Sequence, residues 1–368
     1  MINNFSNDST KDHQVPILID DTIQSLRFFP KTDLNYFASC GWDGKLRIFE
    51  IKNNIVSTST NNDKVNINTN LISQFQFKSP ILSLSWKGDS GNIFTGCCDG
   101  SINYVEFQKN SITKIGEHQY GCREVIYLDN FNLLISGGWD GLLKLWDLRT
   151  PNVPISTYQF ANKIYTMSYS KNLLVIGLSE NNISYFNLDK LQKAKFEPEL
   201  IYQSLLKCQI KKVAALRDGN GYIEGNSEGR VLVKYLNLYN LNFDKINNQI
   251  KSEKDFSFKF HRELRDNNIY AYNVNDISVN PIYGSICVVG GDGKYSIIDL
   301  DKKIKIYERK NYEDKTPLTA CDYNLKGDLL VYASGYDWSK GAKFAHLYSR
   351  PKIFVHYLQN SQRKKIGL

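Results

Sequence analysis

The sequence predicts an all-β protein, folded as one closed β-propeller with seven blades of four strands each. The first observation is a repeated tetrapeptide, Gly-Trp-Asp-Gly, at residues 41–44 and again at 138–141. The second is that each copy separates two alternating apolar stretches and follows a third one. The third is that related turns recur along the whole chain, as Cys-Asp-Gly at 98–100 and Gly-Asp-Gly at 291–293.

Seven copies of this pattern can be aligned by the acidic residue of the turn. These acids are Asp43, Asp99, Asp140, Glu180, Glu228, Asp292 and Asp337. Their mean spacing is about 49 residues, against roughly 40–45 for a blade of the WD-repeat type. The surplus lies in two Asn-rich, polar stretches, which we expect to be insertions, largely mobile. Because each repeat buries its faces only against its neighbours, the array is expected to close on itself.

The Asp-Gly turns are predicted to connect the second and third strands of each blade. An Asp-Gly pair between alternating strands favours a type I′ hairpin turn, in which both central residues have positive φ. An acidic side chain there is expected to accept hydrogen bonds within its own loop rather than to perform acid–base chemistry. The residues assigned to these structural turns are Asp43, Gly44, Asp99, Gly100, Asp140, Gly141, Glu228, Gly229, Asp292 and Gly293.

The strands of each blade can be followed in chain order. A first strand precedes each turn, for example at 23–29, 81–86, 124–128 and 274–280, and the flanking strands of the third copy lie at 132–139 and 142–148. Weaker copies begin at Ile164, Val213 and Leu318. Residues 14–20 are predicted to form the outer strand of the last blade, which would lock the first and last repeats together without a covalent bond.

These assignments divide the chain into a propeller and two short ends. Residues 1–13 are expected to be a flexible segment, 14–358 the propeller with insertions at about 52–70 and 239–273, and 359–368 a basic tail. No stretch approaches the roughly 18 apolar residues of a membrane span, and the first residues lack the features of a signal peptide. Membrane insertion and secretion are therefore not expected.

Composition favours a binding protein in a reducing compartment. Seven cysteines, an odd number, occur without metal-ligand spacing, so reduced thiols are expected, with no disulfides, metal or other cofactor. The net charge of +8 is a mild excess that is compatible with an anionic partner. The five histidines show no metal-ligand spacing either.

Two motifs that would suggest an enzyme fail on their context. Residues 225–229 match G-x-S-x-G, but the residues that follow alternate like a strand, whereas a nucleophile elbow needs a helix there. Residues 290–294 lack the first glycine of a phosphate loop, and Tyr295 replaces its Ser or Thr. The sequence shows no titratable groups converging near the propeller axis, so a non-enzymatic protein is expected.

The chain also resembles a known family. The segments that carry the resemblance are 138–151 (GWDGLLKLWDLRTP), 225–236 (GNSEGRVLVKYL), 256–263 (FSFKFHRE), 274–299 and 332–341 (YASGYDWSKG). They are similar to the WD-repeat family that contains the RNA-export factor of the nuclear pore and its sibling in the spindle checkpoint. The resemblance covers nearly the whole chain, and 332–341 favours the export branch. The sequence departs from the family in its Asn-rich insertions and at Phe260, where the family usually has cysteine.

The resemblance implies a partner and a binding face. Propellers of this family bind a short segment, the GLEBS motif, of an FG nucleoporin or of mitotic checkpoint kinases, and that segment presents glutamates to basic residues beside the turns. Arg230 is the best match, because a guanidinium can pair with a carboxylate in bidentate fashion. The other expected partner contacts are Lys259, Arg262, Trp42, Trp139, Tyr336 and Asp337.

A second surface is a candidate for nucleic acid. The run 301–310 contains several cations, and Lys302, Lys303 and Lys305 are expected to meet the phosphates of single-stranded RNA or of a messenger ribonucleoprotein. The resemblance therefore implies an adaptor in mRNA export at the nuclear pore, in the nucleus and partly in the cytoplasm, acting as a monomeric propeller within a heterocomplex. The alternative is a spindle-checkpoint scaffold that binds mitotic kinases.

Overall fold

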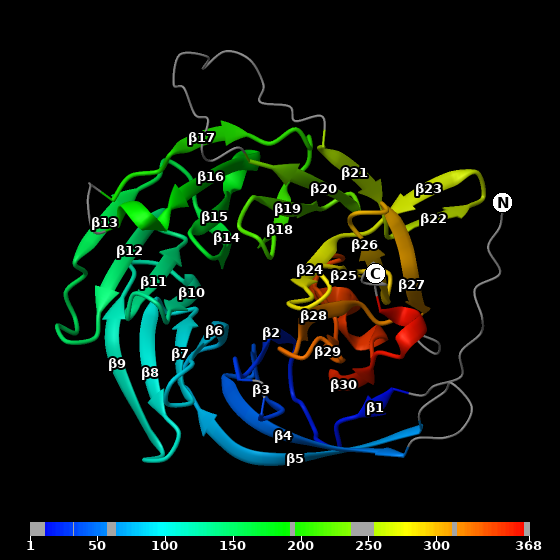
Figure 1. Cartoon of the computed structure of the whole chain (residues 1–368), viewed down its shortest axis with the longest axis horizontal. Coiled ribbons are helices and arrows are strands. Elements are labelled where there is room, and N and C mark those ends of the chain that lie inside the picture. Colours follow the sequence, from blue (N-terminus) through cyan, green and yellow to red (C-terminus); the bar gives the residue numbers. More distant parts are fainter. Residues whose placement is uncertain are drawn as a thin grey trace.

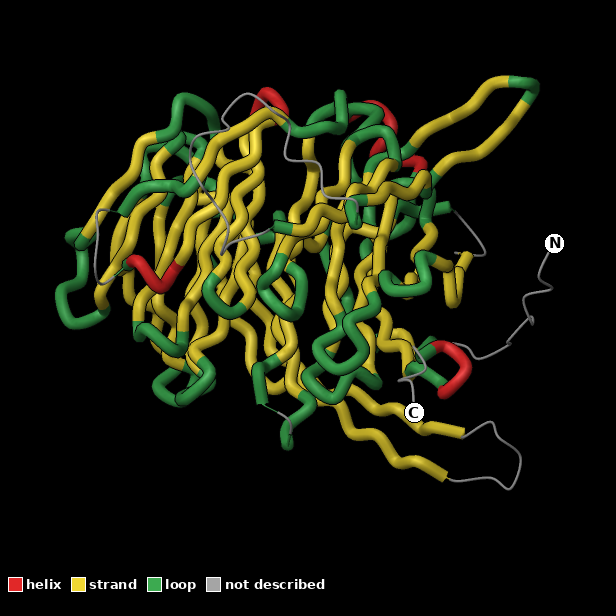
Figure 2. The backbone as a smooth tube through the Cα atoms, turned by 45° about the horizontal axis from the view of Figure 1, so that its top comes forward, coloured by secondary structure: helices red, strands yellow, loops and turns green. Residues whose placement is uncertain are grey.

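The computed structural model describes residues 12–31, 33–56, 64–191, 196–236, 254–310 and 315–363. Seven four-stranded antiparallel sheets are arranged around a central axis, which confirms the predicted seven-bladed propeller (Figure 1). Figure 2 shows the strands standing side by side through the thickness of the disc, with two hairpins that project beyond it.

The blades follow one another in chain order, and each runs from an inner to an outer strand. The first three are β2 (Ile23–Phe28), β3 (Tyr36–Gly41), β4 (Lys45–Val56) and β5 (Lys64–Gln76); β6 (Ile81–Lys87), β7 (Asn92–Cys97), β8 (Ser101–Glu106) and β9 (Ser111–Glu117); β10 (Cys122–Leu128), β11 (Leu133–Gly138), β12 (Leu142–Asp147) and β13 (Ser156–Gln159). The fourth and fifth are β14 (Ile164–Ser170), β15 (Leu173–Leu178), β16 (Asn182–Asn187) and β17 (Leu200–Gln203); β18 (Ile210–Ala215), β19 (Gly221–Asn226), β20 (Arg230–Tyr235) and β21 (Phe256–Lys259). The sixth is β24 (Val274–Val279), β25 (Ile286–Gly290), β26 (Lys294–Asp299) and β27 (Ile304–Lys310), and the seventh is β28 (Leu318–Tyr323), β29 (Leu329–Ser334), β30 (Lys352–Tyr357) and β1 (His13–Gln14).

The hydrophobic core lies between neighbouring blades. The second strand of a blade is covered on both faces, and all six residues of β15 are buried. Between the third and fourth blades, Leu143 and Leu145 pack with Ile164 and Ile176, all 3% exposed or less. Each such side chain contributes about 1.5–3 kcal/mol through burial, so a blade is stable only against its neighbours.

The N-terminal segment closes the ring as the outer strand of the last blade, as predicted, but the residues that form this strand differ from the expected ones. Strand β1 comprises only His13 and Gln14, which pair with Val355 and Phe354 of β30, and the Val15 amide continues the ladder to the Ile353 carbonyl at 2.9 Å. The expected strand at 14–20 is therefore wrong in its bounds. Its apolar residues Val15 and Ile19 enter the core between the last and first blades instead.

A buried ionic cluster fastens this closure. Asp12 contacts His356 Nδ1 of β30 at 2.7 Å and Arg309 Nε of β27 at 3.2 Å, and it accepts a hydrogen bond from the Tyr332 hydroxyl of β29. Burial alone would raise the pKa of Asp12, but His356, Arg309 and Tyr332 hold that pKa below its ordinary value. The flexible segment expected at 1–13 is therefore wrong for Asp12 and His13, which belong to the closed ring; its other residues lie outside the described part of the chain.

The Asp-Gly turns adopt a different backbone from the predicted one. The Gly44 amide donates to the Gly41 carbonyl at 3.2 Å, and Gly44 has φ of +67° while Asp43 does not have positive φ. The turn is therefore of type I followed by a left-handed glycine, and the type I′ prediction is wrong here. The Asp43 side chain accepts a hydrogen bond from the Lys45 amide at 3.0 Å, which agrees with the expected structural role of the acid. In the fourth blade, by contrast, Glu180 and Asn181 both have positive φ.

Buried polar pairs tie several turns to their blade. In the third blade His118 Nδ1 lies 3.0 Å from both Asp140 carboxylate oxygens, His118 Nε2 lies 2.7 Å from Ser136 Oγ, and Trp146 Nε1 donates to the same Oγ at 2.8 Å. Blade six repeats the His–Asp contact with His261 and Asp292. These contacts connect the outer loop, the turn and two strands of one blade.

The two expected insertions contain more regular structure than the polar composition suggested. Residues 52–56 and 64–70 extend β4 and β5 into a long hairpin. The range 239–273 includes β21, the outer strand of the fifth blade, and an additional hairpin of β22 (Arg262–Arg265) and β23 (Asn268–Ala271). Residues 57–63 and 239–253, for which mobility was expected, lie outside the part of the chain that the structure describes.

Short 3₁₀ turns complete the structure at Ser179–Asn181, Leu188–Lys190, Ala342–Leu347 and Asn360–Gln362. The last of these lies in the predicted basic tail. Gln362 is 2% exposed, and its side-chain oxygen lies 2.9 Å from His356 Nε2. The start of the tail is thus packed on the closing blade, while residues 364–368 lie outside the described part of the chain.

We expect Asp12→Ala to lower the free energy of unfolding by about 3 kcal/mol at pH 7, because it removes a buried carboxylate that pairs with Arg309 and contacts His356. Glu50→Ala, which removes only a partner of the exposed Lys52, is the control and should cost little. Urea unfolding measures both.

The lowered pKa of Asp12 also sets the sign of the pH dependence of stability. The advantage of wild type over Asp12→Asn should be full at neutral pH and should shrink as pH falls through that pKa; a constant difference would contradict it.

Gly141→Val is expected to lower the melting temperature by several degrees. Gly141 has φ of +75°, and an added Cβ would lie 2.9 Å from the Phe160 carbonyl oxygen. Gly284→Ala is the matched control, because Gly284 has φ of +65° but no atom within 4 Å of an added Cβ. Thermal unfolding followed by circular dichroism compares them. Equal losses for both variants would show that backbone strain alone, without the contact, determines the cost.

Candidate partner-binding face

All the turns between second and third strands lie on one face of the disc, because every blade has the same chain direction. At the axis this face opens into a cavity of about 940 Å³, which we call the mouth. Its lining residues are Asp21, Thr22, Gln24, Trp42, Arg123, Trp139, Lys163, Tyr165, Gln209, Ile210, Lys211, Asn275, Thr319, Asp337 and Trp338. The mouth thus brings together the turns of blades one, three and seven.

The predicted aromatic contacts divide into two groups. Trp42 is 37% exposed, with Nε1 donating to Gln24 Oε1 at 3.1 Å, and Trp139 is half-buried at the same mouth. Tyr336 is buried, stacks on Tyr348 with centroids 4.6 Å apart, and donates its hydroxyl to the Gly341 carbonyl. The structure therefore corrects the contact predicted for Tyr336, whose ring supports the loop of the last blade. The exposed aromatic residue there is Trp338, which the sequence analysis did not select.

Asp337 remains at the mouth but is already engaged. One of its oxygens accepts from the Ser339 amide and hydroxyl at 3.2 and 2.7 Å, and the other accepts from Asn275 Nδ2 at 3.2 Å. Beside it, Lys211 has a lowered pKa, chiefly because the walls of the mouth remove water from its ammonium group; Arg123 adds repulsion, and Asp337 opposes both effects.

β-Bulges explain why charged side chains face the axis. Each inner strand is interrupted by a register shift two residues from its start, for example between Cys122 and Glu124 and between Ile210 and Lys212. A bulge re-aims the intervening side chain. Arg123 and Lys211 are the bulged residues, and both enter the mouth.

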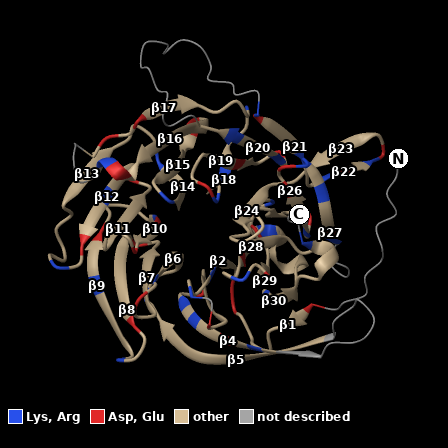
Figure 3. Cartoon of the chain, viewed as in Figure 1, with Lys and Arg blue, Asp and Glu red and all other residues tan. Residues whose placement is uncertain are grey.

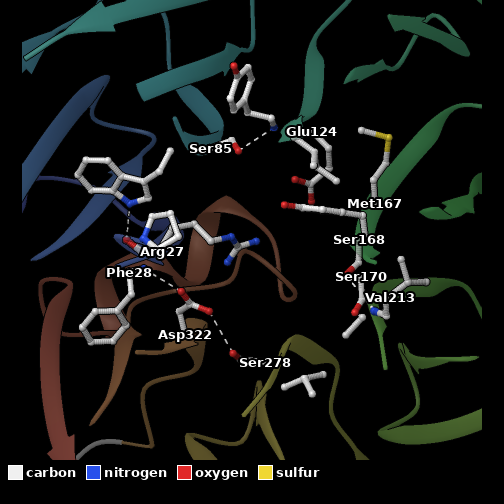
Figure 4. A pocket seen from close by; sticks show the side chains of 18 of the residues that line it. Arg27, Phe28, Ser85, Glu124, Met167, Ser168, Ser170, Val213, Ser278 and Asp322 are labelled. Carbon is white, nitrogen blue, oxygen red and sulfur yellow. Dashed lines mark hydrogen bonds between the residues drawn. The ribbon is translucent and has the colours of Figure 1, made fainter. Parts of the chain in front are cut away.

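Below the mouth, five charged side chains converge near the axis, which the sequence analysis did not expect. They are Arg27, Glu124, Lys212, Asp276 and Asp322, contributed by five blades (Figure 4 labels three of them). Lys212 Nζ lies 3.3 Å from Asp276 Oδ1 and 3.6 Å from Glu124 Oε1. The pKa of Arg27 is raised despite its burial, because Asp322, Asp276 and Glu124 surround it. Beneath this axial cluster is a chamber of about 380 Å³.

The acids of the axial cluster hold the backbone of neighbouring blades. Asp276 Oδ2 accepts from the Cys321 amide at 3.0 Å, and Asp322 Oδ2 accepts from the Phe28 amide at 2.8 Å. Serines do the same elsewhere on the ring, as Ser85 accepts from the Tyr127 amide at 2.9 Å. These side chains satisfy amides of inner strands that have no further strand beside them. Charged residues within otherwise apolar inner strands were the signal for this cluster in the sequence.

A second feature lies on the turn-bearing face at the fifth blade. Three of the candidate residues come together there: Arg230 of β20 is paired with Lys259 of β21, and both Arg230 and Arg262 lie near Glu228. Glu228 Oε2 is 3.6 Å from Arg230 Nε and 3.9 Å from Arg262 Nη2, and Arg262 Nη2 also donates to the Glu228 carbonyl at 3.2 Å. We call Arg230 and Arg262 the two-arginine site.

The two-arginine site has unused hydrogen-bonding capacity. Within the part of the chain that the structure describes, the buried Nε atoms of Arg230 and Arg262 have no hydrogen-bond partner, although both guanidinium groups reach partly into solvent. Buried donors are normally paired, so these two Nε atoms are available to an external acceptor. A carboxylate or another oxyanion has the chemistry of such an acceptor.

The predicted nucleic-acid residues lie on the opposite face. Lys302 and Lys303 are in the turn between β26 and β27, at the other end of the strand from the Asp292 turn. Both are exposed, but Lys303 Nζ lies 4.5 Å from the centre of the Phe256 ring, and Lys305 pairs with Glu308. Figure 3 shows acidic and basic residues interspersed around the ring.

The motifs that were rejected as catalytic are turns, as expected. Ser227 lies between β19 and β20, and Gly291 between β25 and β26, with a strand and not a helix after each. Among the described residues, no group of three His, Cys, Asp or Glu side chains is placed to hold a metal ion. No helix in the described ranges has the length and apolar character needed to cross a membrane.

Comparisons with known proteins give the family. The model of the "WD domain, G-beta repeat" family matches residues 14–50 and 109–147. The poly(A)+ RNA export protein of Schizosaccharomyces pombe is 30% identical over 99% of this chain and 95% of its own length. The mitotic checkpoint protein bub3 of Dictyostelium discoideum is 27% identical over 96% of each chain.

A solved structure supports the fold alone. The WD40 β-propeller domain of Doa1 superimposes with a TM-score of 0.66 over 96% of this chain and 98% of that one, at 12% identity.

The expected non-enzymatic class agrees with the names of the sequence relatives, which are export factors and a checkpoint protein. By its identity to the export protein over nearly the full length of both chains, together with its seven-bladed fold, the chain belongs to the WD-repeat family of mRNA export factors.

Proposed function

We propose that this protein is a non-enzymatic adaptor in mRNA export at the nuclear pore, and that it binds a GLEBS-type segment of an FG nucleoporin on its turn-bearing face. The observation that carries the proposal is the two-arginine site, whose two buried Nε donors have no acceptor among the described residues. A glutamate of the segment would accept from them in charge-assisted hydrogen bonds. The names of the relatives, among them the mRNA export factor GLE2 of Chaetomium thermophilum, support the cellular role.

Glu228 is the internal competitor for the same arginines in this proposal. Its carboxylate lies beyond hydrogen-bonding distance of Arg230 Nε, and its side chain is 46% exposed. A loosely held internal carboxylate keeps the guanidinium groups oriented without saturating them, and it can swing aside at little cost. The aromatic rim of Trp42, Trp139 and Trp338 would provide further contact area for the segment across the axis.

The proposal places the protein in the nucleus and at the nuclear envelope, with a cytoplasmic fraction, as a monomeric propeller within a heterocomplex. Contact of Lys302, Lys303 and Lys305 with single-stranded RNA or a messenger ribonucleoprotein is part of it. Because these lysines lie on the face opposite the two-arginine site, both ligands could bind at once. The second candidate, a checkpoint scaffold for GLEBS-type segments of mitotic kinases, is supported by the similarity to bub3 over the full chain.

Arg230→Glu is expected to weaken binding of a synthetic GLEBS-type peptide by at least about 2 kcal/mol, because a like charge replaces the guanidinium. The fold should remain intact, since the side chain is partly exposed. Arg149→Glu, at a site 88% exposed on the other face, is the matched control. Isothermal titration calorimetry, with a melting curve for each variant, makes the comparison. Unchanged affinity in Arg230→Glu would remove this residue from the site.

Glu228→Gln should have the opposite effect on the same peptide. The substitution removes the internal carboxylate from the two arginines, and we expect affinity to increase about two- to fivefold, in line with the small energies of exposed ion pairs. The same titration measures it, at two salt concentrations. A loss of affinity would show that Glu228 orients the arginines more than it competes for them.

A further inference from the structure

The hairpin of β22 and β23 stands apart from the seven blades. It forms a separate two-stranded sheet in the connection between the fifth and sixth blades, and it projects beyond the rim of the disc (Figures 1 and 2). The Tyr272 amide closes its base on the His261 carbonyl at 2.9 Å. Within the described residues neither of its outer edges pairs with another strand.

One face of this hairpin is apolar and uncovered. Leu264 and Ile269 lie directly opposite each other across the two strands and are 70% and 67% exposed. On the other face Arg265 covers Tyr270 at 5.6 Å and pairs with Glu263, so that face is occupied by its own side chains. An isolated hairpin is marginally stable in water, and an exposed aliphatic pair on it gains most from a partner.

The hairpin is continuous with the two-arginine site. Arg262 is the first residue of β22, and side chains two residues apart on a strand share a face, so Arg262 and Leu264 point the same way. Across from Arg262 stands Ala271, whose small side chain leaves room between the guanidinium and the aliphatic pair. A carboxylate held by the arginines would therefore lie about 7 Å, two strand residues, from the Leu264–Ile269 face.

The charges around the hairpin define the kind of partner. Lys259 and Arg262 lie at its base, Lys315 contacts Glu263 of β22, and Arg265 ends β22 beside the turn; the acids around them are Glu228, Glu263 and Asp266 of the turn, so four cations face three carboxylates. This excess of positive charge favours an acidic segment, and the free edges favour an extended one, because a strand can add to an open edge through main-chain hydrogen bonds.

We propose that the hairpin of β22 and β23 is a second docking surface for the acidic segment that engages the two-arginine site. The segment runs as an extended strand along the hairpin, with a glutamate at Arg230 and Arg262 and an apolar side chain two residues away against Leu264 and Ile269. The hairpin thereby selects segments with the pattern acidic–any–apolar over segments that are only acidic. This inference rests on the proposed function.

The test uses the full-length chain and a synthetic GLEBS-type peptide in isothermal titration calorimetry. The double variant Leu264→Ser, Ile269→Ser should bind at least tenfold more weakly, with a less negative heat-capacity change, because less apolar surface is buried. Leu71→Ser, Ile72→Ser, at 46% and 43% exposure on the outer strand of the first blade, is the matched control and should bind like wild type. A peptide whose apolar residue two positions from the glutamate is replaced by serine should not distinguish the hairpin variant from wild type.

Three outcomes would overturn the inference. If the hairpin variant binds as tightly as wild type while Arg230→Glu binds weakly, the hairpin has no role and the proposed function remains. If neither variant changes binding, both fail. If wild type is a dimer in analytical ultracentrifugation and the hairpin variant a monomer, a second copy of the chain occupies this face. As a readout independent of affinity, the amides of Arg262–Ala271 should gain protection from hydrogen exchange when the peptide binds.

Discussion

Everything in this molecule depends on closing the ring. Seven blades bury their apolar faces only against each other, so an open array would expose the interior of both terminal blades. The closure is short: two residues of β1 pair with β30, and Val15 adds one more main-chain hydrogen bond. The buried Asp12 cluster compensates for this short strand, because it connects the N-terminal segment to both the sixth and the seventh blade through side chains.

The inner strands pose a second problem, which charged and hydroxyl side chains solve. An innermost strand has no neighbour on its axial side, yet its amides must be satisfied. Asp276, Asp322 and Ser85 accept hydrogen bonds from the next blade, and Arg27 and Lys212 balance the carboxylates. Buried charges of this kind are a weak source of net stability, but breaking one of them is costly. Convergence of titratable groups at the axis is therefore accounted for by the architecture, without any catalytic role.

The proposed binding face is built on the same repeated turns. The Asp-Gly turns are structural, yet the residues beside them differ from blade to blade, and in the fifth blade they include two arginines whose Nε donors have no acceptor among the described residues. The neighbouring hairpin lies in the connection between the fifth and sixth blades and carries an exposed aliphatic pair, Leu264 and Ile269. In our proposal, recognition resides in what is added to the propeller at one junction, while the ring provides a rigid platform.

The sequence by itself determined the number and order of the blades and the closure by the N-terminal segment. It also determined the structural role of the Asp-Gly turns and the position of Arg230 just beyond the Glu228–Gly229 turn, because these follow from local patterning and chain order. It did not determine the type of the turns, since Asp-Gly is compatible with more than one backbone and the left-handed conformation was needed only at glycine. Nor did it reveal the axial cluster or the burial of Tyr336, because residues 27, 124, 212, 276 and 322 come from five blades and meet only when the ring is closed. Tertiary structure alone decided which charges became internal, since burial depends on neighbours that are far away in the chain.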